Sequence, residues 1–531
     1  MHLIHRCQQG FTTVTLMGVL MVGGLLVAAS FAAVDPDLGL TQKDDDSKQA
    51  YAAAEAGISY YLNRLAQDSS YYTYCQNVPS ASQNAVNLAW NGSDANTADP
   101  DIDDPRRFRT IPGTASDYAV ELLAVQDADA TVEQCVEGSP SSMIDAKTGS
   151  FRIRATGRAR TPIDRDNNPL TVNDQPKKRS IVATLRRKAF LDYLYFTDRE
   201  TLDPLAYSDS GDRAWAALNC DAPRQSRPNG CTEIQFISED EINGPFHTND
   251  SILVCGSPNF GNDANDAIEL NQSSPGWFSN CGGSSPDFIG TLDFPAGVLP
   301  MPQSNAALEA SADPSYVYSG ETTLVFNGSS VSITNNGSTV SRSLPPSGVI
   351  YVKSTSCSTG YDRTQDYAAA PGCGNVRVSG TYGKDITIGA DNDIIVMDDF
   401  TSSNTTAVLG GLIANNFVRV YHPVSSGWSG CSNNGGPGSI RIDAAILALN
   451  HSFIVDNWYC GNDLGTLTVN GAIAQKFRGP VGTGSGGNVG TGYAKDYNYN
   501  ETLKFREPPY FVNPTDSPWR VIRQNEQVPA R

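Results

Sequence analysis

Four carboxylates stand close together in the sequence, at Asp391, Asp393, Asp398 and Asp399. Cleavage of a glycosidic bond uses two carboxyl groups at a defined separation, one of which keeps its proton through a raised pKa. Asp is also a common turn former, because its side chain bonds to nearby backbone N–H groups. Both interpretations stay open. Since this cluster is the only support for catalysis, we do not expect an enzyme.

The chain contains eleven cysteines, and Cys7 near the N-terminus leaves an even ten after it. None forms a CxxC motif, and only His247, His422 and His451 lie beyond the first ten residues, so no metal site is expected. We predict structural disulfides formed in an oxidising compartment. Sequence does not fix their connectivity. The simplest pairing joins neighbours: Cys75 with Cys135, Cys220 with Cys231, Cys255 with Cys281, Cys357 with Cys373, and Cys431 with Cys460.

Other chemical motifs are weak. The segment Asp164–Asn168 begins like a calcium loop, but Pro169 replaces the expected glycine and Gln175 stands at the twelfth position, so it fails as an EF-hand. No phosphate loop or dinucleotide fingerprint is present in the sequence, and no Cys/His or Ser/His pairing has local support. We therefore expect no cofactor.

Length and charge bound the architecture. The 531 residues are enough for two or three domains, each with its own core. The 57 acidic and 38 basic residues give a net charge of −19. Such a surface repels phosphate backbones, so nucleic acid is not an expected partner.

The element that positions the rest is an uncharged apolar run from Phe11 to Val34. At about 1.5 Å per residue it can cross a hydrocarbon layer of about 30 Å as one helix. The leader before it carries Arg6 and no acid, which favours a cytoplasmic N-terminus. Pro36 should kink this helix, after which apolar residues recur at helical spacing as far as Gln67. Membrane-facing positions are Val14, Leu16, Leu20, Leu25, Val27 and Phe31.

The junction Gln9-Gly10-Phe11 resembles a class III, type IV prepilin signal. The resemblance implies that a prepilin peptidase cuts after Gly10 and that Phe11 becomes the N-methylated first residue. The family usually has Glu at the fifth mature position, where this chain has Thr15, and that departure favours a minor pilin. Two alternatives stay open: an uncleaved signal anchor, and a secretory signal cleaved after Ser30-Phe31-Ala32.

Two later stretches resemble PilX-like minor pilins. The tract Tyr51–Ile58 is similar to their Ala-rich helix, and the block Arg179–Asp198, which ends in Phe190–Asp198, looks like the strand that closes their head. Strand-like runs at Tyr118–Val125, Phe151–Arg160 and Ser180–Leu194 should form an antiparallel sheet beneath the helix. The arginines of the middle run are interpreted as a solvated strand face.

From about Thr201 the chain becomes a series of short Ile/Val-rich runs separated by Gly, Asn, Asp and Ser. Residues 411–417, 445–451 and 471–477 resemble one another, and residues 244–250 are a looser copy. Each places an amide a few residues after an apolar pair. A degenerate repeat of this kind favours a right-handed β-solenoid over a β-sandwich, which stays open.

The predicted fold class is α+β: a long N-terminal transmembrane pilin helix with a small antiparallel sheet, followed by a mainly β domain. The expected division is a leader (residues 1–10), a helix (11–67), a head (68–200), a β-solenoid-like domain (201–478), and a Gly-rich linker with an aromatic C-terminal cap (479–531).

The expected function is structural: a minor pilin that displays the β domain for adhesion or for priming assembly. Expected partners are the prepilin peptidase, other pilin subunits, the membrane, and a surface polysaccharide or host-cell ligand. The precursor would sit in the inner membrane and the mature chain at the cell surface. Alternatives are an anchored adhesin or carbohydrate-binding protein independent of pili, and a β-helical polysaccharide hydrolase or lyase.

Overall fold

The structure, a computed structural model, describes residues 43–73, 108–123, 143–144, 149–160 and 176–530, except residue 239 and the pairs 272–273, 358–359, 365–366, 368–369, 428–429, 486–487 and 515–516. The chain divides into two compact units. Unit 1 comprises Met1–Met143, Arg152–Thr184 and Arg523–Arg531, and unit 2 comprises Ile144–Phe151 and Leu185–Ile522.

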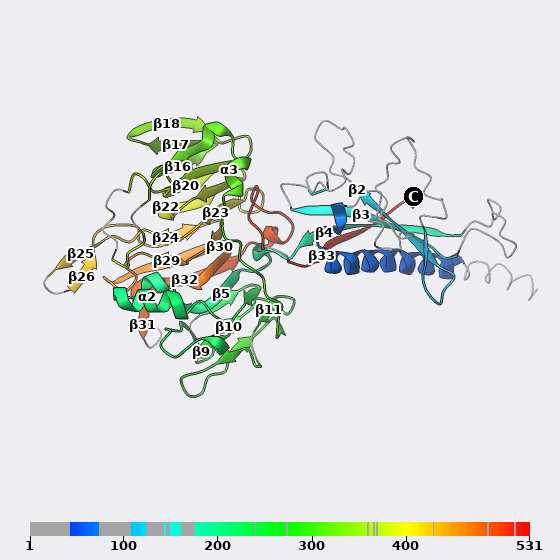
Figure 1. Cartoon of the computed structure of the whole chain (residues 1–531), viewed down its shortest axis with the longest axis horizontal. Coiled ribbons are helices and arrows are strands. Elements are labelled where there is room, and N and C mark those ends of the chain that lie inside the picture. Colours follow the sequence, from blue (N-terminus) through cyan, green and yellow to red (C-terminus); the bar gives the residue numbers. More distant parts are fainter. Residues whose placement is uncertain are drawn as a thin grey trace, which may run out of the picture. The chain divides into compact units, whose positions relative to one another are not determined.

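In unit 1, a helix over residues 43–67 packs on a five-stranded sheet (Figure 1). The helix face toward the sheet is made of small residues: Ala50, Ala53 and Ala54 are at most 1% exposed. Opposite them lies Gly157, where an added Cβ would stand 2.1 Å from the backbone oxygen of Ala50. The helix can lie this close because neither surface carries a bulky side chain at the contact.

The sheet of unit 1 has the order β1-β2-β3-β4-β33. Its strands are β1 (Arg109–Thr110), β2 (Asp117–Leu123), β3 (Ser150–Arg158), β4 (Lys178–Arg187) and β33 (Trp519–Gln527). The β1–β2 and β2–β3 pairs are antiparallel. Two arginines of the run 151–160, Arg152 and Arg160, are exposed as expected of a solvated strand face. The other two are not: Arg158 is 1% exposed and donates to Asp117 at 2.7 Å, and Arg154 pairs with Glu121. Opposite charges on neighbouring strands therefore neutralise the part of this face that is buried.

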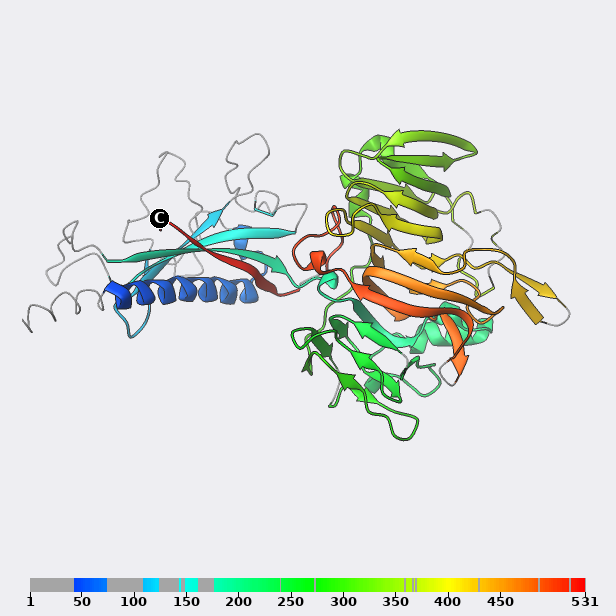
Figure 2. The same ribbon diagram turned by 180° about the vertical axis from the view of Figure 1, so that it is seen from behind.

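Unit 2 is a stack of successive coils of the chain, which we term the coil stack. The short strands of each coil, or rung, pair in parallel register with those of the next (Figure 2). In spatial order, the first ladder contains β15 (Val317–Ser319), β19 (Val349–Lys353), β21 (Ile386–Ala390), β23 (Gly410–Ala414), β28 (Ala445–Ala448), β30 (Asp463–Arg478), β5 (Tyr195–Leu202), β8 (Phe246–Thr248), β11 (Ala267–Leu270) and β14 (Thr291–Asp293). Inward side chains of these strands form a continuous core. Parallel register distinguishes this stack from a sandwich of antiparallel strands.

A second ladder runs beside the first. It contains β16 (Thr322–Gly328), β20 (Val376–Tyr382), β22 (Ile394–Ser402), β24 (Val418–Val420), β27 (Ile440–Ile442), β29 (Phe453–Val455), β30, β32 (Asn488–Tyr499), β7 (Glu241–Asn243), β10 (Asn259–Phe260) and β13 (Asp287–Phe288). A third, short ladder contains β6 (Gln235–Ile237), β9 (Ile252–Cys255) and β12 (Trp277–Phe278).

The chain enters the coil stack in its middle. The first strand, β5, pairs with β8 on one side and with β30, the last strand of its ladder along the chain, on the other. From β5 the rungs run to β14, residues 294–316 then lead to β15 at the other end, and the remaining rungs return to β30. After β32 the chain forms β33 in the sheet of unit 1. Unit 2 is therefore inserted between β4 and β33.

The expected α+β fold led by a membrane-spanning helix is wrong for the described residues. Strands dominate them, because the short β-branched runs each form a rung. No helix within the described part of the chain is long and apolar enough to cross a membrane. The helix over 43–67 has a charged outer face, and the apolar run Phe11–Val34 lies outside the described residues.

Two further expectations need correction. The first half of the block Arg179–Asp198 forms β4 and joins the sheet of unit 1, but β33 lies beyond it at the edge. The second half, Phe190–Asp198, is not part of this sheet: it forms the 3-10 turn η6 (Phe190–Asp192) and the start of β5. Residues 479–531 are not only a linker and cap, since they contain β31 (Gly482–Ser485), β32 and β33. The pairings of β33 with β4 and of β32 with β7 each join residues hundreds of positions apart, so no local pattern indicates them.

Candidate functional site

Polar side chains of the coil stack gather where strands of the first ladder end and the chain turns. Asn392 donates from Nδ2 to Oδ1 of Asn375 at 2.6 Å, and Asn416 donates in the same way to Asn392 at 2.6 Å. Each amide thus bonds to an amide of the neighbouring coil. The recurring asparagines of the sequence form part of this corner, because a stacked amide satisfies a polar group that the turn buries.

The four clustered aspartates do not converge on one space. Asp393 is 2% exposed and accepts a hydrogen bond from Arg419, while Asp391 accepts the hydroxyl of Tyr351. Asp398 and Asp399 lie exposed on β22. Asp391 and Asp393 are thus hydrogen-bonded to other side chains of unit 2, while Asp398 and Asp399 are exposed. The close spacing in sequence therefore does not produce the facing pair of carboxyl groups that glycoside cleavage uses.

Arg419 is the centre of a buried ion cluster. Its guanidinium donates to Asp393 at 2.8 Å and to Asp456 at 2.9 Å. Burial raises the pKa of Asp456, and the charge of Arg419 opposes that rise. Removing one member of such a cluster would leave a buried charge uncompensated, at a cost of about 3–5 kcal/mol. This cluster serves stability.

A Ser, a His and an Asp do meet at one corner, in the wrong order for catalysis. Asp203 is the central group: it accepts from Ser452 Oγ at 2.9 Å and contacts His451 Nδ1 at 3.1 Å. In a nucleophilic triad the imidazole stands between the hydroxyl and the carboxylate, so that it can take the hydroxyl proton. Asp203 also accepts from the N–H of Leu205 and caps the turn that follows β5.

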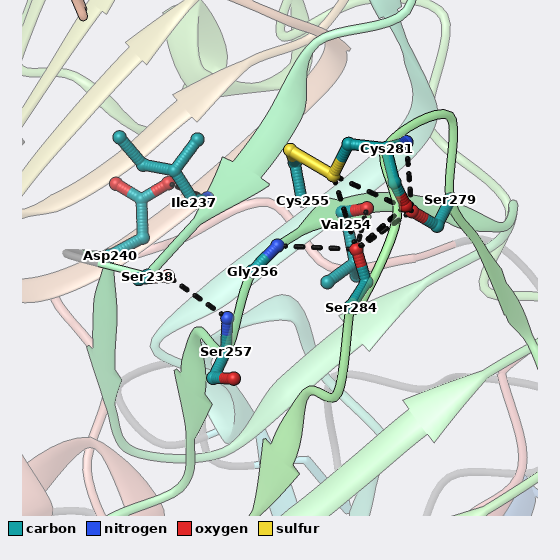
Figure 3. The surroundings of a disulfide bond; sticks show 10 residues. All are labelled: Ile237, Ser238, Asp240, Val254, Cys255, Gly256, Ser257, Ser279, Cys281 and Ser284. Carbon is teal, nitrogen blue, oxygen red and sulfur yellow. Dashed lines mark hydrogen bonds between the residues drawn. A yellow bond between two sulfur atoms is a disulfide. The ribbon is translucent and has the colours of Figure 1, made fainter. Parts of the chain in front are cut away.

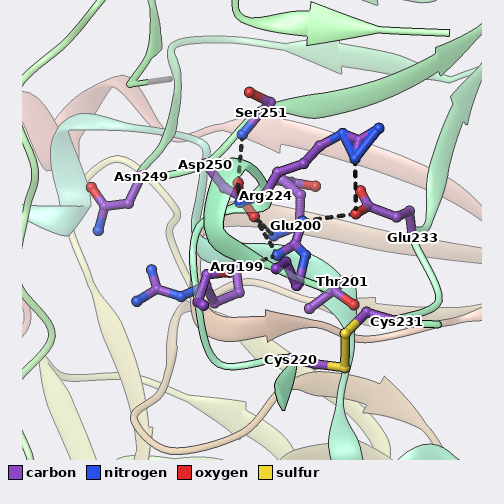
Figure 4. Close-up of polar contacts among 12 residues, drawn as sticks. Arg199, Glu200, Thr201, Cys220, Arg224, Cys231, Glu233, Asn249, Asp250 and Ser251 are labelled. Carbon is purple, nitrogen blue, oxygen red and sulfur yellow. Dashed lines mark hydrogen bonds and ion pairs between the residues drawn. A yellow bond between two sulfur atoms is a disulfide. The ribbon is translucent and has the colours of Figure 1, made fainter. Parts of the chain in front are cut away.

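The candidate site is the excursion over residues 203–234, which leaves the coil stack between β5 and β6 (Figure 4). Its base is clamped by Asp250, which is fully buried and accepts from the N–H of Arg224 at 2.8 Å and from the guanidinium of Arg227 at 2.7 Å. Arg227 also donates to Glu233 at 2.9 Å, within the excursion. The disulfide Cys220–Cys231 closes the loop.

The excursion presents α2 (Ser210–Asn219) to solvent. Asp209 caps the helix, and Ala216 is its one buried residue. Trp215 is 38% exposed and Leu218 is 87% exposed. The disulfide Cys220–Cys231 and the ion pairs of Arg227 with Asp250 and Glu233 thus hold in place a helix that exposes apolar side chains. This arrangement suits binding, because a rigid surface loses little conformational entropy on association.

A cavity of about 70 Å³ lies inside the coil stack, where β5 meets β30 and β32. Its lining includes Tyr195, Phe236, Gln475, Arg478, Lys495 and Tyr497. Arg478 stands 3.5 Å from Glu200, and Lys495 stands 2.9 Å from Asp240. The charges are therefore paired within the fold. The cavity is large enough for several water molecules and contains no arrangement of nucleophile and base.

The structure forms four of the five neighbour disulfides suggested by sequence order: Cys220–Cys231, Cys255–Cys281, Cys357–Cys373 and Cys431–Cys460. The other expected site residues lie outside the described residues: Gly10, Phe11, Val14, Leu16, Leu20, Leu25, Val27, Phe31, Cys75 and Cys135. The calcium-like segment also lies outside them. Within the described ranges, no group of three or more His, Cys, Asp or Glu side chains is arranged to hold a metal ion.

Sequence reasoning missed the clamp of the excursion. Asp250 and Arg227 are 23 residues apart. Glu200, whose backbone N–H donates to Asp250 at 3.1 Å, lies a further 27 residues before Arg227, so no local spacing links the three. The one available signal was the loose repeat over 244–250, whose last residue is this aspartate.

No protein-family model matches the sequence, and no curated protein sequence matches it. Among solved structures, the competence-associated pilin ComZ from Thermus thermophilus is similar at 12% sequence identity. The similarity covers 91% of this chain and 97% of that chain, with a TM-score of 0.25. A TM-score of this size carries no argument about fold or function.

Proposed function

We propose that the chain is a pilin-like structural subunit that carries a large β unit for display. The observation that carries this proposal is the docking of the helix over 43–67, through Ala50, Ala53, Ala54 and Gly57, on the sheet of unit 1. This helix follows the apolar run Phe11–Val34 and the junction Gly10-Phe11 in the sequence. A membrane-length segment leading into a docked helix is what an assembly subunit requires.

The finer role that we propose is that of a minor pilin. Thr15 stands in place of the glutamate that would neutralise a neighbouring terminal amine, so bulk polymerisation is not the expected task. The proposed partners are the prepilin peptidase, other pilin subunits and the membrane. The proposed route leads from the inner membrane to the cell surface, and the four disulfides support an oxidising destination.

Adhesion is favoured over assembly priming as the use of the β unit. The excursion over 203–234 supports this choice, since it exposes Trp215 and Leu218 from a stapled helix. Its ligand would be a surface polysaccharide or a host-cell component. The role that we propose is non-enzymatic. It is supported by the different surroundings of the clustered aspartates, since Asp393 is buried while Asp398 and Asp399 are exposed.

N-terminal mass spectrometry of the mature protein tests the proposal. We expect methylated Phe11 as the first residue in cells that have prepilin peptidase, and an intact leader in cells that lack it. Recovery of Met1 in both strains would support an uncleaved anchor. Recovery of Ala33 would support a secretory signal, and either result would overturn the proposed processing.

A further inference from the structure

The two ends of the coil stack differ in how they are covered. At the β15 end, the antiparallel hairpin of β17 (Ser330–Asn335) and β18 (Ser338–Ser343) folds over the core, and Val331 and Ile333 are at most 1% exposed. Tyr316 donates to the backbone oxygen of Ser343 at 2.7 Å and fixes this cover. Stacks of repeats need such caps, because a terminal rung has no neighbour to bury its inner face.

The opposite end is formed by β12, β13 and β14, which we term the last rung. Its inward side chains Trp277, Phe288 and Leu292 are only partly buried. Their partners one rung further in, Ile252, Phe260 and Ile268, are 0% exposed. Ile289 beside them is 44% exposed. The stacked inward side chains of the core therefore end in an apolar surface at this end of the coil stack.

The backbone of the last rung is also open. Asp287 and Ile289 donate their N–H groups inward, to Pro258 and Phe260, both at 2.9 Å. Alternate residues of a parallel ladder face opposite edges, so the N–H of Phe288 points to the outer edge. In β14 the N–H of Thr291 donates inward to Asp266, so the N–H of Leu292 also points to the outer edge. Among the strand pairs of the described residues, β13 pairs with β10 and β14 with β11, and nothing pairs on their outer side.

The last rung is held rigid from within (Figure 3). The disulfide Cys255–Cys281 joins the loop before β13 to β9. Ser284 donates to the backbone oxygen of Val254 at 3.2 Å and accepts from the N–H of Gly256 at 3.2 Å. An edge fixed in this way offers strand geometry at little entropic cost to a partner.

Charge selects the partner. Residues 274–293 contain Asp287 and Asp293 and no lysine or arginine. Both aspartates are exposed, beside the inward Phe288 and Leu292. A second copy of this chain, set edge to edge, would bring these aspartates toward each other, and like charges on facing strands destabilise pairing.

We propose that the last rung is a docking edge for an extended segment of another protein in which apolar residues alternate with lysine or arginine. The segment adds a strand beyond β13 and β14, accepts and donates backbone hydrogen bonds at Phe288 and Leu292, and covers their side chains. Its basic residues lie beside Asp287 and Asp293. Strand addition of this kind draws affinity from the backbone and specificity from alternate side chains.

The test uses the full chain in detergent micelles and a fluorescent peptide of alternating valine and lysine. A second peptide carries glutamate in place of lysine. We expect the lysine peptide to bind on the order of tenfold more tightly, and the D287K/D293K variant to reverse that preference, because two cross-strand pairs change sign. The matched control is Glu241→Lys, an exposed residue in the same column as Asp287 but two rungs further in, which should keep the preference.

Hydrogen exchange of the Phe288 and Leu292 amides distinguishes the proposed partner from two other possible occupants of the edge: another segment of this chain and a second copy of it. Bound lysine peptide should slow exchange at both amides in the wild type and leave it unchanged in D287K/D293K. The proposal is overturned if neither peptide binds, or if the double variant keeps the wild-type preference. Slow exchange at both amides in the free monomer would assign the edge to another segment of this chain. Slow exchange that appears only on dimerisation would assign it to a second copy.

Discussion

Replacing Gly157 by alanine should loosen the docking of the helix over residues 43–67. The new Cβ would stand 2.1 Å from the oxygen of Ala50, 2.4 Å from the nitrogen of Ala54 and 2.8 Å from the Cβ of Ala53. Two of these atoms belong to the helix backbone, so no change of rotamer can relieve the contact. The helix itself must move away from the sheet.

The expected cost follows from opposing contributions. Alanine in place of glycine restricts the unfolded chain and would by itself stabilise by about 0.4–1 kcal/mol. Overpacking against a fixed backbone costs about 1–3 kcal/mol. The helix also buries Ile58, Tyr61 and Leu65, each at most 2% exposed, and complete undocking would forfeit roughly 1.5–3 kcal/mol for each. We therefore expect a net destabilisation of about 2 kcal/mol, since the helix shifts without leaving the sheet.

Hydrogen exchange of the helix amides in the full chain measures this effect. A loss of about 2 kcal/mol should speed exchange through local opening by about 30-fold. The control is Gly297→Ala, where an added Cβ meets no atom within 4 Å, and its exchange should match the wild type. If Gly157→Ala leaves the helix as protected as the control does, the close approach of helix and sheet is not a determinant of docking and the reasoning fails.

Two buried glutamates of unit 2 are expected to respond to pH in opposite directions. Burial raises the pKa of Glu507 to about 7, against the opposing charge of Arg186. Between about pH 4.5 and 7 the folded chain then holds a proton that the unfolded chain has lost, so stability falls as the pH rises, and Glu507→Gln should remove about 3 kcal/mol of that fall. Burial also disfavours the charge of Glu269, but hydrogen bonds from His247 and Lys188 outweigh it and lower the pKa to about 2. That stabilisation is present above about pH 4.5 and is lost as the pH falls toward 2, so Glu269→Gln should flatten the acid limb by about 3 kcal/mol. Urea unfolding of the wild type and both variants across about pH 2–8 measures both slopes. A difference curve without them would contradict the assignments.

Local pattern predicted the parts of the fold whose causes are local. The buried face of the helix over 43–67 follows from apolar residues at steps of three and four, and the strands β20, β21 and β22 begin at or near the Ile/Val runs of residues 376–396. Neighbour order matched four disulfides, since each joins residues at most 29 positions apart. The predicted α+β class is wrong for the described residues because the many short β-branched runs from residue 195 onward each form a strand, while the membrane-length apolar run lies outside these residues.

Long-range partners could not be predicted from spacing. Asp250 meets Arg227 across a turn that the disulfide Cys220–Cys231 closes, and Arg478 meets Glu200 from the other end of the chain. The clustered aspartates show the converse, because residues near in sequence have different surroundings. Asp393 lies just before β22, where it is buried against Arg419, whereas Asp398 and Asp399 both lie on an exposed part of that strand.

The order of the rungs has a consequence for how the chain reaches its native state. Tyr195 of β5, the first strand of the ladder along the chain, pairs with Ile473 of β30, the last one, and β4 meets β33 only after unit 2 is complete. Contacts of such sequence separation form late, because loop closure must precede them. Until then β5 and β4 each present an unpaired edge, which is a site of misassembly. The disulfides of unit 2 join residues at most 29 positions apart, so they can secure its coils before these closing pairs form.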